Sequence, residues 1–99
     1  MAHRIAPQAA ADLDGIWLYV ARESGSLDVA TRLIDSISAR FCFLANFPWA
    51  GRARNEDFGF GSRSFALGEY VIVYRVEEAD VFILRVVHGR RELPGLFDR

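Results

Sequence analysis

The last third of the chain contains two long apolar runs, residues 69–76 and 81–88, separated by the short acidic segment 77–80. Valine, isoleucine, tyrosine and phenylalanine dominate both runs, a mixture that is typical of buried β-strands. Neither run alternates cleanly between apolar and polar residues, as a small antiparallel sheet with one solvent-facing side would. We therefore expect a β-hairpin that is covered on both faces, with a second molecule supplying part of the cover.

Two stretches in the first half of the chain repeat apolar residues at the spacing of an α-helix. Pro7 fits the first turn of the first helix, and Gly25 supplies a left-handed end to it. Ser26 is placed to cap the second helix, which should end at Asn46, before Pro48. The two apolar stripes consist of Leu13, Ile16, Trp17 and Val20, and of Ala30, Leu33, Ile34, Ile37, Phe41 and Leu44. Together they predict a helical hairpin that is stabilised by packing on a sheet.

The remaining segments complete an α+β fold with the order β-α-α-β-β-β. Residues 3–6 form a short first strand, residues 49–61 are irregular, and residues 63–67 form a strand before the hairpin. A chain of 99 residues has room for one core. We therefore expect a single domain over residues 1–99, with the helical hairpin packed on a small, mainly antiparallel sheet.

Composition and charge narrow the range of functions. An apolar fraction of 52% argues against disorder, and a net charge of −1 argues against a dedicated nucleic-acid binder, which usually carries a basic excess. All 12 basic residues are arginine, which suits protein interfaces, although a GC-rich genome explains the lack of lysine without any site. The single cysteine, Cys42, allows no internal disulfide, and there is no signal peptide or transmembrane run. We expect a cytoplasmic protein without metal, cofactor or membrane partner.

No strong catalytic motif is present: there is no phosphate-binding loop, metal-ligand spacing or nucleophile elbow. His3 and His88 are far apart in sequence, and structural roles are expected for both. Asp12 and Asp14 flank an apolar helix position, and a solvated face near the helix start explains them better than acid–base chemistry.

Two arginines, Arg75 and Arg85, interrupt otherwise apolar strands. Charged side chains are rarely buried without a partner. Three explanations remain open: these side chains edge into solvent, they pair with acids such as Glu69, or they bind an acidic partner protein.

Five segments, spread over nearly the whole chain, carry a resemblance to a known family. They are residues 11–17, 47–54, 63–65, 70–76 and 83–91, which read ADLDGIW, FPWAGRAR, RSF, YVIVYRV and ILRVVHGRR. Their order and spacing resemble ParE-type toxins of the RelE/ParE superfamily, from bacterial type II toxin–antitoxin (plasmid stabilisation) modules. Each segment alone is a weak signal, and the five in register are a strong one.

The superfamily holds two activities, and RelE-like members cut messenger RNA on the ribosome. Such members rely on an arginine early in the third strand, an arginine after the last strand and a tyrosine in the tail. Here Arg91 matches the second position, but Val71 stands at or near the first and Phe97 at the third, and residues 63–67 lack the lysines of those RNases. The resemblance therefore assigns no catalytic residue, with Arg91 as the one candidate if the chain is an RNase.

ParE-like members are expected to poison DNA gyrase by binding and to be wrapped by the apolar and acidic C-terminal segment of a ParD-like antitoxin. The resemblance implies a heterotetramer or a larger complex with that antitoxin. We predict antitoxin contacts at Trp17, Arg63, Tyr70, Ile72, Tyr74, Arg75 and Arg85. We predict target contacts at His88, Arg90, Arg91, Leu93 and Phe97, although residues 93–97 could instead close the core. Ribosome-dependent RNA cleavage and a non-toxic relic of the family are the alternatives.

Overall fold

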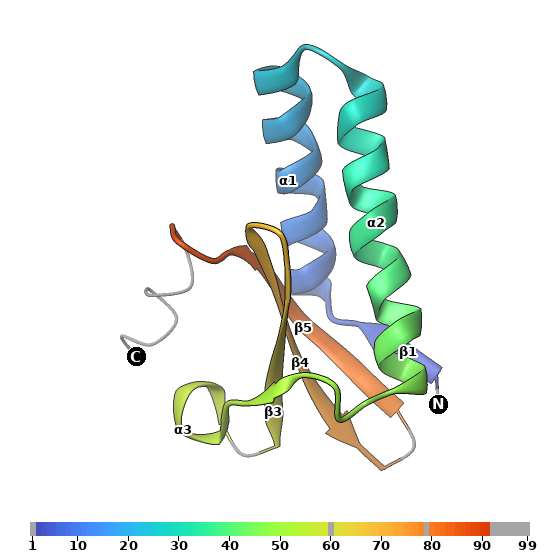
Figure 1. The fold of residues 1–99 in the computed structure, drawn as a ribbon, viewed down its shortest axis with the longest axis vertical. Helices are drawn as coiled ribbons and strands as arrows, with labels where there is room; N and C mark the ends of the chain where they lie inside the picture. Colours follow the sequence, from blue (N-terminus) through green and yellow to red (C-terminus); the bar gives the residue numbers. More distant parts are fainter. Residues whose placement is uncertain (1, 60, 79, 92–99) are drawn as a thin grey trace.

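The computed structural model describes residues 2–59, 61–78 and 80–91 and contains a helical hairpin and a five-stranded sheet (Figure 1). The elements are β1 (Ala2–Ile5), α1 (Pro7–Ser24), α2 (Leu27–Asn46), β2 (Arg52–Ala53), α3 (Asn55–Phe58), β3 (Ser62–Leu67), β4 (Tyr70–Glu77) and β5 (Asp80–His88). The strand order is β1-β5-β4-β3-β2, and only the β1–β5 pair is parallel. The predicted α+β class and its mainly antiparallel sheet are confirmed.

The helix ends follow the local sequence signals. Pro7 is the first residue of α1, and Gly25 ends that helix at φ 69° with its N–H donating to the Ala21 carbonyl at 3.0 Å. The Ser26 hydroxyl accepts a hydrogen bond of 3.2 Å from the Val29 N–H and caps α2. Figure 1 shows the two helices side by side, extending past the sheet at their joined end.

The segment between α2 and β3 is more regular than expected. The sequence predicts irregular structure for residues 49–61, but residues 52–53 pair with β3 as strand β2 and residues 55–58 form the helical turn α3. A two-residue strand has no periodicity, so it leaves no sequence pattern. The first strand also covers residues 2–5 rather than 3–6.

A β-bulge in β5 explains part of the missing alternation in the hairpin. Val73 pairs with Arg85, whereas the next residue, Tyr74, pairs with Ile83, so Leu84 is an extra residue in β5. One extra residue reverses the side-chain phase of the strand. Consequently Val81 and Ile83 before the bulge, and Val86 after it, all join the core on the helix side.

The opposite face of the sheet is partly covered by the chain itself. Val73 and Ser64, which pair across β4 and β3, are 2% and 6% exposed. Arg54 folds over this face: its Nε donates to the Ser64 Oγ at 2.8 Å, and its carbonyl accepts from the Ser62 Oγ at 2.9 Å. The expectation that a second molecule supplies part of the cover is therefore corrected for these residues, which the chain covers itself.

The core lies between the helical hairpin and the β1–β5–β4 part of the sheet. Its buried members are Ala9, Ile16, Ile37, Phe41, Leu44, Ile72, Tyr74, Val81, Ile83 and Val86. Helix α1 packs on β5, and α2 packs on β1 and β5. Arg63, Phe65 and Leu67 lie on the helix side of β3, where Phe65 and Leu67 are partly buried against the edge of the core. Within the described residues no helix is long and apolar enough to cross a membrane.

Candidate functional site

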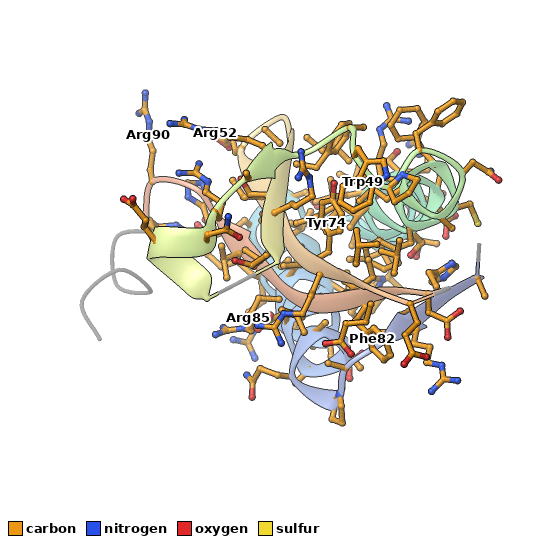
Figure 2. The ribbon with its side chains drawn as sticks, turned by 90° about the horizontal axis from the view of Figure 1, so that it is seen from below. Trp49, Arg52, Tyr74, Phe82, Arg85 and Arg90 are labelled. Atoms are coloured by element: carbon orange, nitrogen blue, oxygen red, sulfur yellow. The ribbon has the colours of Figure 1, made fainter. Side chains whose placement is uncertain are left out.

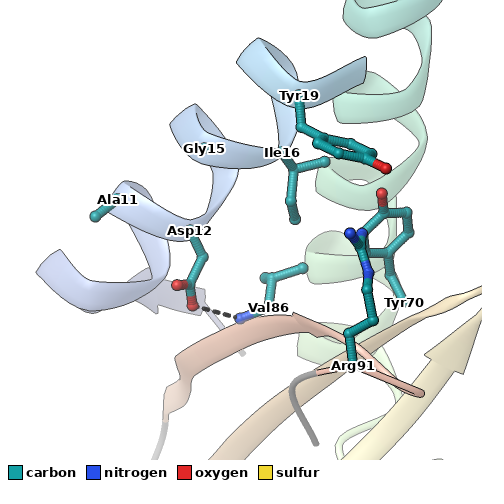
Figure 3. Close-up of a pocket in the computed structure, with 8 residues that line it drawn as sticks. All are labelled: Ala11, Asp12, Gly15, Ile16, Tyr19, Tyr70, Val86 and Arg91. Carbon is teal, nitrogen blue, oxygen red and sulfur yellow. Dashed lines mark hydrogen bonds between the residues drawn. The ribbon is translucent and has the colours of Figure 1, made fainter. Parts of the chain in front are cut away.

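A pocket of about 310 Å³ lies between α1 and the end of β5 (Figure 3). Its lining comes from three places along the chain: Ala11, Asp12, Gly15, Ile16 and Tyr19 on α1, Tyr70 at the start of β4, and Val86 and Arg91 at the end of the chain's described part. Gly15 leaves the α1 wall open, because a Cβ there would meet no atom within 4 Å. The pocket therefore has an apolar floor and a polar end where Tyr19, Tyr70 and Arg91 meet.

Asp12, at one wall of this pocket, makes hydrogen bonds that hold α1 to β5. Its carboxylate accepts from Arg85 Nε at 2.8 Å and Nη2 at 3.1 Å, and from the Val86 N–H at 2.9 Å. Strand β1 pairs with β5 only as far as Ile83, so the Val86 N–H lies on an edge that none of the described strands covers, and Asp12 takes the place of a strand partner.

These contacts correct two expectations from the sequence. The Asp12 side chain is 9% exposed, so the solvated-face interpretation is wrong for Asp12. Arg85 pairs with this acid, 73 residues away in sequence, rather than with Glu69. An arginine that is already paired twice with a carboxylate is a weaker candidate for binding an acidic antitoxin than an unpaired one.

His88 shapes the turn that brings Arg91 to the pocket. Its Nδ1 accepts hydrogen bonds from the N–H groups of Arg90 at 3.3 Å and Arg91 at 3.2 Å, and its ring meets Tyr70 edge-on at 5.6 Å. The guanidinium of Arg91 then lies 4.8 Å from the centre of the Tyr19 ring, a cation–π arrangement. His88 is 9% exposed, so its part in any target contact is to place Arg91.

Among the described residues, the other residue predicted to contact the target, Arg90, does not line the pocket. Arg90 is exposed, and Figure 2 shows its side chain projecting away from the body of the molecule. Leu93 and Phe97 lie outside the described residues. Among the described residues of the predicted target set, Arg91 lines the pocket, and His88 holds the Arg91 backbone from outside the lining.

A second candidate surface consists of Phe43, Phe47, Trp49 and Phe65, which we call the aromatic ledge. The ring centres of Phe43 and Phe47 are 5.1 Å apart, and those of Phe43 and Phe65 are 5.6 Å apart. The exposed fractions are 37% for Phe43, 59% for Phe47 and 66% for Trp49. Arg63, two residues before Phe65 on the same side of β3, lies 5.3 Å from the centre of the Trp49 ring. Clustered aromatic and arginine side chains are typical of the centres of protein interfaces.

Ile72 and Tyr74, predicted as antitoxin contacts, are both fully buried. They belong to the core and present no side-chain surface to a partner, which corrects that prediction. The Tyr74 hydroxyl instead accepts from the Gly51 N–H at 2.8 Å and donates to the Pro48 carbonyl at 2.9 Å. Burial raises the pKa of the Tyr74 phenol, an effect partly opposed by the Gly51 N–H and the Arg63 charge.

The remaining predicted antitoxin contacts lie in separate places. The Trp17 Nε1 donates to the Thr31 Oγ1 at 3.2 Å and links the two helices. Tyr70 lines the pocket. Arg75 lies on the sheet face away from the helices, with its Nη1 3.6 Å from Glu77 and its buried Nε without a hydrogen-bond partner among the described residues. Of the seven predicted residues, only Arg63 lies at the ledge.

Sequence reasoning missed the ledge, although a signal was present. Phe43 lies outside the apolar stripe that contains Phe41 and Leu44, so it must face another direction. The run Phe47-Pro48-Trp49 places two large aromatic residues just after a helix end, where exposure is common. Asp12 had no comparable signal, because its partners Arg85 and Val86 lie at the other end of the chain.

The Asp12 carboxylate is not free for acid–base chemistry in this arrangement. The pocket carboxylate, Asp12, accepts three hydrogen bonds, so to act as a general base it would first have to leave Arg85. Among the described residues, no group of three or more histidine, cysteine or acidic side chains could hold a metal ion.

Comparison with known proteins identifies the class of fold first. A chain in a solved structure described as "Chromosomal ParDE TA system from P. aeruginosa" matches this fold with a TM-score of 0.76 and 24% identity, over 89% of this chain and 95% of that chain. The likeness shows that the helical hairpin and its sheet have the same fold as that chain.

The sequence comparisons show the family. The model of the family "ParE toxin of type II toxin-antitoxin system, parDE" matches residues 4–93. Toxin ParE3 of Caulobacter vibrioides is 34% identical over 84 residues, which are 85% of this chain and 82% of the relative. Toxin ParE1 of the same organism is 34% identical over 86 residues, or 87% and 86%. The chain belongs to the ParE toxin family of type II toxin–antitoxin systems, which confirms the resemblance and implies an antitoxin partner.

Proposed function

We propose that this chain is a cytoplasmic toxin that a ParD-like antitoxin neutralises by covering the aromatic ledge, and that it stops growth by binding DNA gyrase. The observation that carries the proposal is the ledge itself, in a member of a toxin family. Phe47 and Trp49 are more than half exposed, and the Arg63 guanidinium lies over the Trp49 ring. Large exposed aromatic patches on small proteins mark interaction surfaces, and tryptophan and arginine are the side chains that dominate binding energy there.

Charge at the ledge supports an apolar and acidic partner segment. Arg63 lies at one end of the ledge. Arg40 is exposed one turn before Phe43 on α2, and residues three apart on a helix share a face. Carboxylates of a bound segment can therefore meet a guanidinium at either end while apolar side chains cover the aromatic rings.

The antitoxin part is tested with the purified chain and the product of the adjacent gene. Trp49→Ala should weaken binding by about 30-fold or more, the effect of losing an interface hot spot. The matched control is Leu27→Ala, which removes another exposed apolar side chain, 64% exposed, at the opposite end of the 20-residue α2. It should change affinity by less than about threefold. A wild-type chain that does not bind the adjacent gene product would overturn the proposal.

The gyrase part is supported by the sequence, in which Val71 and Phe97 stand at or near positions where RelE-like RNases carry an arginine and a tyrosine. In a supercoiling assay, purified gyrase should stall and accumulate cleaved DNA when the wild-type chain is added. Arg91→Ala should abolish this effect while antitoxin affinity is kept, because Arg91 belongs to the pocket rather than to the ledge. Undisturbed supercoiling at concentrations that stop growth would show a different target.

RNA cleavage is the second candidate, favoured by one observation. Arg91 reaches a pocket that also carries the phenols of Tyr19 and Tyr70, and such groups can stabilise charge and move protons at a phosphodiester. Cleavage of messenger on ribosomes, with intact gyrase activity, would make this the function.

Antitoxin binding without growth arrest would instead identify a non-toxic relic. Light scattering of the complex tests the proposed heterotetramer or larger assembly.

A further inference from the structure

The loop that carries Trp49 is held by side chains from the sheet. Residues 48–51 connect α2 to β2 and make one backbone turn of their own, from the Ala50 N–H to the Phe47 carbonyl at 3.0 Å. Tyr74 on β4 bonds the Pro48 carbonyl at 2.9 Å and the Gly51 N–H at 2.8 Å.

Arg63 on β3 completes the attachment. Its Nε and Nη2 donate to the Gly51 carbonyl at 3.0 and 2.6 Å, and its Nη2 also reaches the Trp49 carbonyl at 3.2 Å. We call Tyr74 and Arg63, with these bonds, the loop latch. Three of the four loop residues thus have backbone groups tied to two rigid strands.

Gly51 allows the loop to approach the sheet this closely. A Cβ at this position would lie 2.7 Å from the Ser64 carbonyl oxygen and would overlap the Tyr74 hydroxyl. Backbone contact at such range requires glycine. The latch is therefore a built feature of the fold, formed by a buried tyrosine, an arginine and a glycine from three elements.

The latch has a consequence for the exposed side chain of Trp49. At 66% exposure a tryptophan would normally sample several rotamers, and fixing it on binding would reduce affinity. Here the Trp49 carbonyl is tied to Arg63, and the same guanidinium lies over the indole ring. The ring is held at the surface before any partner arrives. Figure 2 shows Trp49 and the buried Tyr74 on neighbouring parts of the fold.

We propose that Tyr74 and Arg63 are positioning residues for antitoxin binding: they fix the 48–51 loop so that Trp49 is presented, preorganised, to an apolar and acidic segment of the antitoxin. This inference rests on the function proposed above. It gives Tyr74, which cannot touch a partner, an indirect role, and it gives Arg63 a role that differs from a simple surface charge.

The first test concerns the free protein. In a Trp17→Phe background, where Trp49 is the remaining tryptophan, Tyr74→Phe should lower the fluorescence anisotropy of Trp49 and increase its quenching by acrylamide. Arg63→Gln should act in the same direction. Unchanged Trp49 mobility in both variants would overturn the latch. This measurement needs no antitoxin, so it is independent of the proposed function.

The second test is a double-mutant cycle with the adjacent gene product. Tyr74→Phe should weaken binding by about tenfold, because ordering the loop then opposes association. In a Trp49→Ala background the same change should have less than about a twofold effect, because Tyr74 acts through Trp49. Ile37→Val, which lowers stability from a buried site on α2, is the control and should leave affinity unchanged.

Two results would contradict the inference. If the effects of Tyr74→Phe and Trp49→Ala simply add, or if Tyr74→Phe lowers the melting temperature without changing affinity, Tyr74 is only structural. If the wild-type chain does not bind the adjacent gene product, the proposed function fails and the antitoxin part of the inference fails with it. The anisotropy result then still decides whether the latch orders Trp49.

Discussion

The clearest stability prediction concerns Asp12, which holds two parts of the chain that are 73 residues apart. Asp12→Ala removes the bidentate partner of Arg85 and the acceptor of the Val86 N–H at the open edge of β5. No strand can replace that acceptor, because β1 leaves the sheet after Ile5. The Val86 N–H then loses its hydrogen bond to the Asp12 carboxylate.

The magnitude follows from the two losses. A buried backbone N–H without an acceptor costs about 1–3 kcal/mol. Breaking a buried ion pair costs about 3–5 kcal/mol, but Arg85 is 29% exposed and can turn to water, so only part of this applies. Alanine also has a better helix propensity than aspartate, which offsets about 0.5 kcal/mol of the loss in stability. We expect a net loss of about 2–3 kcal/mol in the free energy of unfolding.

Urea unfolding, followed by circular dichroism, measures this difference. Asp14→Ala is the matched control, because it changes the same residue type two positions away on the exposed face and carries the same propensity gain. It should remain within about 0.5 kcal/mol of the wild type. Asp12→Asn, which keeps an acceptor for the Val86 N–H, should lie between the two. If Asp12→Ala unfolds like Asp14→Ala, the carboxylate does not hold the β5 edge and the reasoning is refuted.

Three further predictions follow from the glycines and from Tyr74. Gly51→Ala should destabilise the chain by about 1–3 kcal/mol in the same unfolding assay, since the added Cβ overlaps the Tyr74 hydroxyl and the Ser64 carbonyl. Gly15→Ala should stabilise it by up to about 1 kcal/mol, because the Cβ meets no atom and glycine disfavours a helix interior; a loss of stability there would contradict the open pocket wall. The pKa of Tyr74 is raised above its ordinary 10.0, so its neutral form is favoured in the folded state. Wild-type stability should therefore fall as the pH rises above about 10, with a smaller fall in Tyr74→Phe, and parallel profiles would contradict the pKa assignment.

Local signals made the helical hairpin predictable. Pro7, Gly25 and Ser26 act within one or two turns of their own position, so their effect can be seen in a short stretch of sequence. The β4–β5 hairpin followed from apolar runs and a short turn in the same way. These are interactions between residues that are close in the chain. The strand order, with β1 parallel to β5, could not be predicted from the sequence.

The bulge and the candidate sites depend on contacts that no short stretch contains. The extra residue Leu84 reverses which face of the sheet each following side chain of β5 points to. The apolar residues before and after it therefore give the same sequence pattern as a strand that is buried on both sides. Tyr74 was predicted to contact the antitoxin, whereas its hydroxyl binds the carbonyl of Pro48, 26 residues away in the chain. The roles of Tyr74, Arg85 and Asp12 depend on hydrogen-bond partners that lie 23 to 74 residues away in the sequence.

The ledge and the pocket are built from different elements, and this separation has a consequence for how a toxin is controlled. The ledge uses α2, the 48–51 loop and β3, whereas the pocket uses α1, the start of β4 and the end of β5. Trp49→Ala should therefore remain toxic but escape the antitoxin, and Arg91→Ala should lose toxicity but still bind it. Growth of cells with antitoxin supplied at increasing levels measures both properties together. If each variant loses both properties, the antitoxin and the target share one continuous surface.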